Sequence, residues 1–95
     1  MRLLTTEILK NEAKVHPLGS GYQYTEKIGD YTLSIIGGVR GQYGDFENDF
    51  EVALIDNTDG RFVTGMYSKR GESDGIMAYA SIDEINDLYL NIPRK

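Results

Sequence analysis

The middle of the chain alternates between apolar and polar residues with the two-residue period of half-buried strands. In residues 48–56, for example, Phe50, Val52 and Leu54 alternate with Glu51 and Ala53. Every second side chain of a strand points to the same face of its sheet. We therefore predict strands at residues 22–28, 31–36, 48–56, 61–67 and 75–79.

Turn residues separate these predicted strands. Gly29 and Asp30 suit a two-residue hairpin turn, because glycine accepts the positive φ that primed turns require. Residues 57–60 read Asn-Thr-Asp-Gly, which is a strong turn signal between the third and fourth strands. Gly65 lies inside the fourth predicted strand and indicates a bulge or a close backbone approach.

The N-terminal part of the chain has a short helical pattern. Thr5 or Thr6 can cap a helix over residues 7–13, and Pro17 and Gly19 end it.

The C-terminal part has a complete helix-start signature. Ser81 and Glu84 have the spacing of a capping box, in which each side chain accepts from the backbone amide of the other residue. An apolar stripe with helical spacing follows at Ile82, Ile85, Leu88, Tyr89 and Ile92.

Together these elements predict one α+β domain over residues 1–95. It consists of an antiparallel, meander-like sheet of about five strands, with a short N-terminal helix and a C-terminal helix packed on it. A chain of 95 residues with 40% apolar residues supports a single modest core.

Composition narrows the possible chemistry. There is no cysteine, which excludes a disulfide scaffold, a thiolate nucleophile and a cysteine-based zinc site. The first residues lack the apolar region of a secretory signal, and no run approaches the ~20 apolar residues of a membrane span. We therefore expect a cytoplasmic protein that has no membrane partner.

The net charge of −5 bears on the partner. An acidic chain repels nucleic-acid phosphates, so we expect no direct binding to DNA or RNA. The alternative is that the acidic residues imitate a phosphate backbone for a DNA-binding protein.

An acidic row runs into the third predicted strand. Asp45, Glu47, Asp49 and Glu51 alternate with other residues, so in an extended chain all four carboxylates would face the same way. Such a row suits a divalent cation, a basic partner surface, or simply solvent. The calcium-loop template is not met, because Phe50 stands where that template needs glycine. We predict neither a metal ion nor a cofactor.

The row follows a connection with four glycines among residues 37–45. It lacks both the dinucleotide fingerprint and the phosphate-binding GxxxxGK[ST] motif. Arg40, Gln42, Tyr43 and Phe46 have instead the arginine and aromatic character of protein-recognition loops. This connection is our first candidate for a contact surface.

Catalysis has little support in the sequence. His16 is the only histidine, it stands beside Pro17, and no serine lies in a nucleophile-elbow setting. The hypothesis of a small hydrolase therefore rests only on His16 and the carboxylates. An uncovered strand edge could also pair two copies into a homodimer.

Four segments together resemble small acidic proteins encoded by bacteriophages. They are residues 31–38, 43–53, 75–79 and 81–86. Such proteins, which include anti-CRISPR and other anti-defence inhibitors, commonly bind a host protein and block its surface. The resemblance implies this class of protein and assigns a role to no residue.

The sequence therefore favours a protein-binding module that is not an enzyme. The expected function is that of a phage-encoded inhibitor, which occupies the surface of a host or CRISPR-type defence protein. The predicted contact residues are Arg40, Gln42, Tyr43, Asp45, Phe46, Glu47 and Asp49. The alternative is a metal- or small-ligand-binding accessory domain that uses the Asp45–Glu51 carboxylate row.

Overall fold

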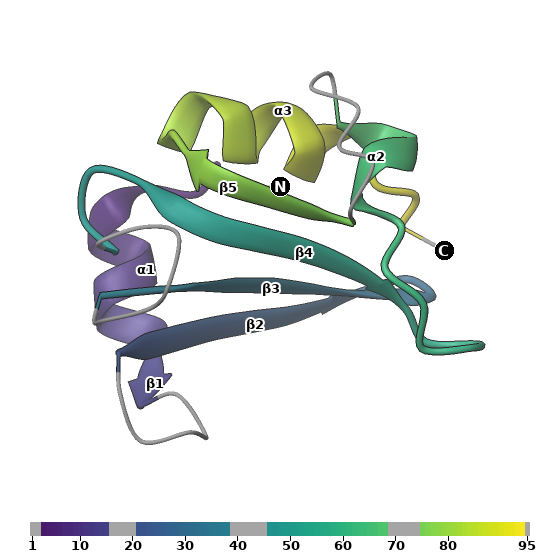
Figure 1. The fold of residues 1–95 in the computed structure, drawn as a ribbon, viewed down its shortest axis with the longest axis horizontal. Helices are drawn as coiled ribbons and strands as arrows, with labels where there is room; N and C mark the ends of the chain where they lie inside the picture. Colours follow the sequence, from purple (N-terminus) through teal and green to yellow (C-terminus); the bar gives the residue numbers. More distant parts are fainter. Residues whose placement is uncertain (1–2, 16–20, 39–45, 69–74, 95) are drawn as a thin grey trace.

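The structure is a computed structural model that describes residues 3–15, 21–38, 46–68 and 75–94. These residues form one antiparallel sheet together with three helices (Figure 1). In chain order the elements are α1 (Thr6–Glu12), β1 (Lys14–Val15), β2 (Tyr22–Ile28), β3 (Tyr31–Gly37), β4 (Phe50–Asp56), α2 (Thr64–Tyr67), β5 (Ile76–Ala80) and α3 (Ile82–Asn91).

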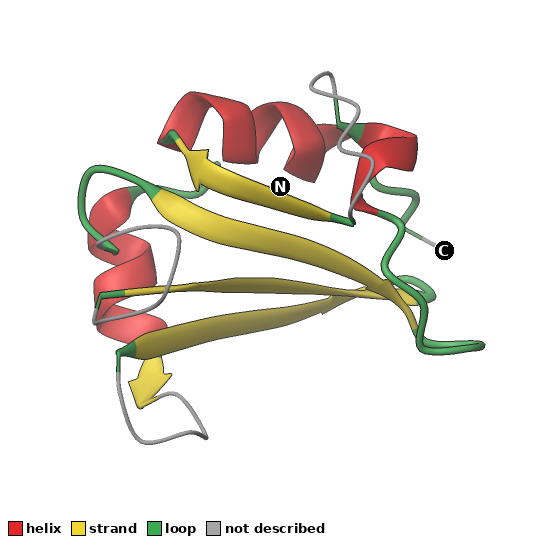
Figure 2. Ribbon diagram, viewed as in Figure 1, coloured by secondary structure: helices red, strands yellow, loops and turns green. Residues whose placement is uncertain are grey.

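The sheet is a five-stranded meander in the order β1-β2-β3-β4-β5, and every neighbouring pair is antiparallel. The tight turn at Gly29 sets the register of the first long hairpin, in which Ile28 pairs with Tyr31. This arrangement confirms the predicted α+β class, with a short helix near the start of the chain and a longer helix near its end (Figure 2).

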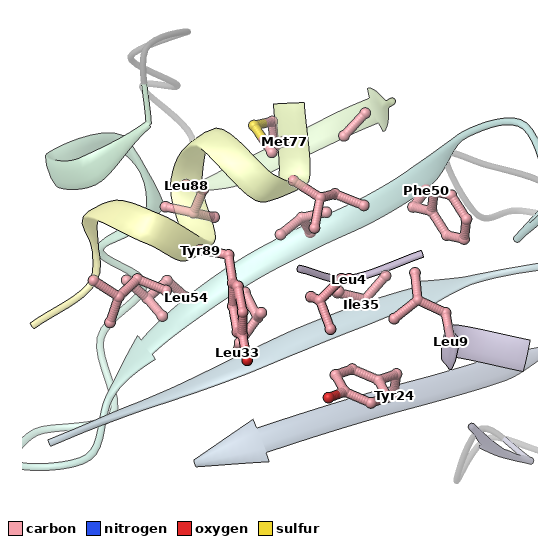
Figure 3. Packing of buried hydrophobic residues seen from close by; sticks show 14 of the residues in the cluster. Leu4, Leu9, Tyr24, Leu33, Ile35, Phe50, Leu54, Met77, Leu88 and Tyr89 are labelled. Carbon is pink, nitrogen blue, oxygen red and sulfur yellow. The ribbon is translucent and has the colours of Figure 1, made fainter. Parts of the chain in front are cut away.

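The two-residue alternation divides the sheet into a buried and an outer face. In β4, Phe50, Val52 and Leu54 are fully buried, whereas Glu51 and Ala53 between them are only partly covered. The buried residues pack against both terminal helices in a single core, which Figure 3 shows from close by. Both helices therefore cover the same face of the sheet.

The helices supply the side of this core that faces the sheet. Leu9 of α1 and Leu88 of α3 are fully buried, and Tyr89 is nearly so. Burying a side chain of leucine size stabilises a fold by roughly 1.5–3 kcal/mol. The predicted stripe on the C-terminal helix is thus the surface that joins α3 to the sheet.

Side-chain caps mark the N-termini of α1 and α3. The Ser81 Oγ accepts a 3.1 Å hydrogen bond from the Glu84 amide, and the Glu84 carboxylate accepts one of 2.9 Å from the Ser81 amide. At α1, the Thr5 Oγ1 accepts from the Ile8 amide at 3.1 Å. The capping box predicted at Ser81 is therefore confirmed.

Asn86 connects the two ends of the chain. Its Oδ1 accepts from the Leu4 amide at 2.9 Å, and its Nδ2 donates to the Leu4 carbonyl at 2.8 Å. These two hydrogen bonds fix the backbone of the segment that precedes α1 to α3.

The prediction of a strand at residues 61–67 is wrong. Phe62 makes only an isolated bridge to Ile55, and residues Thr64–Tyr67 form α2. Because β4 pairs directly with β5, no position in the sheet is left for another strand between them. The fifth strand is instead β1, which follows the predicted N-terminal helix.

Thr64 accounts for this departure from the strand pattern. Its hydroxyl accepts from the Leu54 amide at 2.8 Å and donates to the Gly75 carbonyl at 2.6 Å. Among the described residues it is the one polar side chain that is fully buried. One side chain thus satisfies backbone groups of β4 and of the start of β5.

We predict that Thr64→Val destabilises the protein by about 2–4 kcal/mol, because the buried Leu54 amide and the partly buried Gly75 carbonyl each lose their hydrogen bond to the hydroxyl. Thr64→Ser keeps the hydroxyl and loses one methyl group, at a cost of about 1 kcal/mol. Urea unfolding of the two variants measures the difference. Equal losses would show that the hydroxyl is unimportant.

Candidate partner-binding site

A pocket of about 360 Å³ opens at the end of the sheet where β2 begins and β3 ends. Among the described residues it is lined by Lys10, Tyr22, Phe46 and Glu47. Lys10 comes from α1, Tyr22 is the first residue of β2, and the other two precede β4. Figure 1 shows α1 at this end of the sheet.

Tyr22 forms an aromatic wall of the pocket. It pairs with Gly37 across the hairpin, so its ring lies beside the point where the chain leaves β3. A Cβ on Gly38 would come within 3.1 Å of the Tyr22 ring, and Gly38 has a φ of +106°. Only glycine therefore suits both the backbone and the position of the ring. Tyr22 as a whole is 51% exposed.

Phe46 packs against the Tyr22 ring. Its ring centroid lies 5.7 Å from that of Tyr22 and 5.2 Å from that of Phe50, the latter edge-on. The residue has a φ of +58°, and its amide donates to the Asp49 carbonyl at 3.0 Å, so the chain turns here. The turn sends the ring inward, and only 3% of the residue is exposed.

This burial corrects the expectation for Phe46. Its position after a glycine-rich connection suggested an exposed aromatic anchor, but its ring belongs to the core. Tyr22 lies at the same place on the surface and has the exposure that an anchor needs.

An ion pair forms the rim of the pocket. The Lys10 Nζ lies 2.6 Å from the Glu47 Oε1, and the side chains are 45% and 62% exposed, respectively. The Thr6 hydroxyl adds a long, 3.5 Å hydrogen bond to the Glu47 carbonyl. Solvent-exposed pairs of this kind contribute about 0–1 kcal/mol, so the contact positions charge without dominating stability.

The described part of the predicted carboxylate row, from Glu47 to Glu51, is not one extended strand. Residues 46–48 bend, and β4 begins only at Phe50. Glu47 therefore turns to Lys10, while Glu51 lies in β4 opposite Ile36. Across the described residues, no three His, Cys, Asp or Glu side chains are grouped so that they could hold a metal ion.

The remaining predicted contact residues divide into two groups. Asp49 lies in the turn before β4 and accepts from the Phe46 amide through its carbonyl. Arg40, Gln42, Tyr43 and Asp45 lie outside the described residues. Predictions for those four residues remain predictions from sequence.

Sequence reasoning missed Tyr22 and Lys10. The hairpin turn at Gly29 already implies that Tyr22 stands opposite Gly37, so counting back along the two strands could have placed its ring beside the glycine-rich connection. No comparable signal exists for Lys10. Its distance from Glu47 depends on how α1 packs against the sheet.

A polar cluster between β2 and α3 holds these two layers together. The Glu26 carboxylate accepts from the Tyr24 hydroxyl at 2.5 Å and from the Tyr89 hydroxyl at 2.7 Å. The Arg94 guanidinium lies 4.8 Å from the centre of the Tyr89 ring. Because the groups of this polar cluster bond to one another across the two layers, we assign the cluster a structural role.

A pair of tyrosines links β3 to α2. The hydroxyls of Tyr31 and Tyr67 lie 2.8 Å apart, and their rings meet edge-on. The hydrogen bond to Tyr67, followed by partial burial and the nearby Tyr67 charge, raises the pKa of Tyr31 to about 12. The fold therefore favours the neutral form of Tyr31.

Comparison of the chain with protein-family models, with curated proteins and with solved structures finds no match. Within the described part of the chain, no helix has the length and apolar character needed to cross a membrane.

We predict that Gly38→Ala destabilises the protein by about 1–3 kcal/mol and also displaces the Tyr22 ring. Gly60→Ala is the matched control. Its φ of +76° carries a similar backbone strain, but a Cβ there meets nothing within 4 Å. Urea unfolding gives the stability of each variant, and NMR shifts report the Tyr22 ring. Unchanged Tyr22 ring shifts in Gly38→Ala would contradict the proposed contact.

We predict that Tyr67→Phe lowers the pKa of Tyr31 toward its ordinary value of 10.0. In the wild type the folded state holds this proton more tightly than the unfolded chain does. The resulting stabilisation is complete below pH 10.0 and is lost as pH rises to about 12. NMR titration of the Tyr31 ring gives the pKa, and unfolding measured over the same range should be less pH-dependent in Tyr67→Phe. A Tyr31 pKa that is the same in Tyr67→Phe as in the wild type would contradict this account.

Proposed function

We propose that the chain is a protein-binding module without catalytic activity, and that it contacts its partner through the pocket end of the sheet. The observation that carries this proposal is Tyr22, whose ring lies close to Gly38 and packs against Phe46 while the residue stays 51% exposed. An aromatic ring held in this way loses little freedom on binding.

The chemistry of the surroundings fits a protein partner. Aromatic and arginine side chains are enriched where protein interfaces concentrate their binding energy, and charged groups at the rim set orientation and association rate. Tyr22 supplies the ring, and Lys10 and Glu47 supply the rim. The net charge of −5 favours a partner with a basic surface.

The sequence extends the same surface. Residues 39–45 connect Gly38, which touches Tyr22, to Phe46, which packs against it. Arg40, Gln42, Tyr43 and Asp45 lie in this connection. They remain in the proposed contact set with Glu47 and Asp49, whereas Tyr22 takes the place of Phe46 as the aromatic anchor.

The biological role that we propose is inhibition by occupation of a partner's surface. The resemblance to small acidic phage proteins supports a host or CRISPR-type defence protein as the partner. An inhibitor of this kind needs only complementary shape and charge, which the pocket end of the sheet can supply.

We predict that Tyr22→Ala and Tyr43→Ala each weaken binding by about tenfold or more, the loss expected for an anchor residue. Affinity capture from bacterial lysate identifies the partner, and interferometry with the purified partner then measures each variant. Phe62→Ala is the control, since Phe62 is 54% exposed and belongs to the β4–β5 side of the sheet.

The melting temperature of Tyr22→Ala should remain close to that of the wild type, because half of the residue is already exposed. Binding that is unchanged in both tyrosine variants would exclude this end of the sheet. A Phe62→Ala loss as large as theirs would likewise place the contact elsewhere.

A further inference from the structure

The Tyr22 ring is the first feature that limits what the pocket accepts. Tyr22 lines the pocket and is 51% exposed, so a ligand in the pocket can reach its ring. The face of an aromatic ring carries negative electrostatic potential and attracts a cation within about 6 Å of its centre. Tyr22 therefore favours a positively charged group.

The rim of the pocket is the second feature. The Glu47 side chain is 62% exposed, and among its contacts is the Lys10 ammonium at 2.6 Å. That pair shows that a cationic group is accommodated beside the pocket. Because an exposed pair contributes only about 0–1 kcal/mol, an incoming cation can displace Lys10 from Glu47 at little cost.

The combination of ring and carboxylate distinguishes among cations. A guanidinium is planar and weakly hydrated, so it can stack on Tyr22 while its N–H groups point to the Glu47 carboxylate. A lysine ammonium is compact and strongly hydrated, and it cannot make both contacts as well. An apolar side chain would instead remove water from the Lys10–Glu47 pair without replacing any hydrogen bond.

Resting on the proposed function, we infer that the pocket receives an arginine side chain of the partner protein. The guanidinium stacks on Tyr22 and pairs with Glu47. Lys10 is then an internal competitor that occupies the carboxylate in the free protein. The chain's net charge of −5 favours the approach of such a basic residue.

Substitutions of the two rim residues should consequently have opposite effects. Lys10→Met removes the competitor and should strengthen binding, whereas Glu47→Gln removes the acceptor and should weaken it. A purely structural ion pair would give no effect on binding from either change. A site for anions would give the reverse signs, because Lys10 would then be the ligand.

The probe is a Gly-Arg-Gly peptide with blocked ends, titrated at millimolar concentration into the full-length ¹⁵N-labelled chain. We expect saturable shifts at the amides of Tyr22 and Glu47. Peptides with lysine or with uncharged citrulline in place of arginine should bind more weakly, and inorganic phosphate should not shift these amides.

Lys10→Met should bind the arginine peptide about two- to fivefold more tightly, and Glu47→Gln about two- to fivefold more weakly, as expected for one exposed ion pair. Lys27→Met and Asp83→Asn are the controls, since they change the net charge equally at exposed positions away from the pocket. Equal effects from these controls would mean that overall charge, rather than the pocket, selects the peptide, and would overturn the inference.

Three other outcomes would also overturn the inference. They are the absence of shifts with the arginine peptide, equal binding of the citrulline peptide, and Lys10-dependent binding of phosphate. If one of them occurs while Tyr22→Ala still weakens partner capture, the proposed function stands and only the arginine is excluded. If the peptide binds as expected but partner capture is unchanged in Tyr22→Ala and Tyr43→Ala, the proposed function fails instead.

Discussion

The structure depends on the burial of one face of a five-stranded sheet beneath two short helices. Leu33, Ile35 and Leu54 of the central strands are fully buried, and α3 covers them with Leu88 and Tyr89 (Figure 3). A domain of this size buries only about 60–65% of its unfolded surface, so it has little apolar area beyond this one layer. Polar contacts then fix how the layers lie: Tyr89 bonds to Glu26 on β2, and Asn86 binds the backbone of Leu4.

The position of the pocket also follows from the way in which the helices cover the sheet. The seven-residue helix α1 reaches only one end of the sheet, where β2 begins and the chain leaves β3. At that corner the core ends with Phe46, and the next aromatic ring outward, Tyr22, is half exposed. Lys10 of α1 and Glu47 of the turn meet at the rim, since the helix and the turn cover the same corner. The residues of the proposed partner contact that the structure describes therefore lie at the edge of the core, where Tyr22 is 51% exposed.

The two main departures from the sequence pattern have one kind of cause. Residues 61–67 have strand-like composition, but the Thr64 hydroxyl bonds to backbone groups of β4 and of Gly75, and the chain turns into α2. Phe46 follows a glycine-rich connection, but its ring packs in the core against Tyr22 of β2. In both cases a contact with a distant segment outweighs the local preference, and such contacts leave no trace in periodicity. Strands 22–28 and 31–36 were predictable because each carries its own alternation and a tight turn joins them.

By itself, the sequence determined the α+β class, the meander of the long strands and the capped C-terminal helix. These depend on local chemistry: a two-residue period, turn glycines, and the reciprocal bonds of Ser81 and Glu84. Only the tertiary structure decided which side chains share the pocket. Lys10 and Glu47 are 37 positions apart, and they meet because the packing of α1 on the sheet places them there. That packing minimises exposed apolar area over the whole chain, so no single segment encodes it.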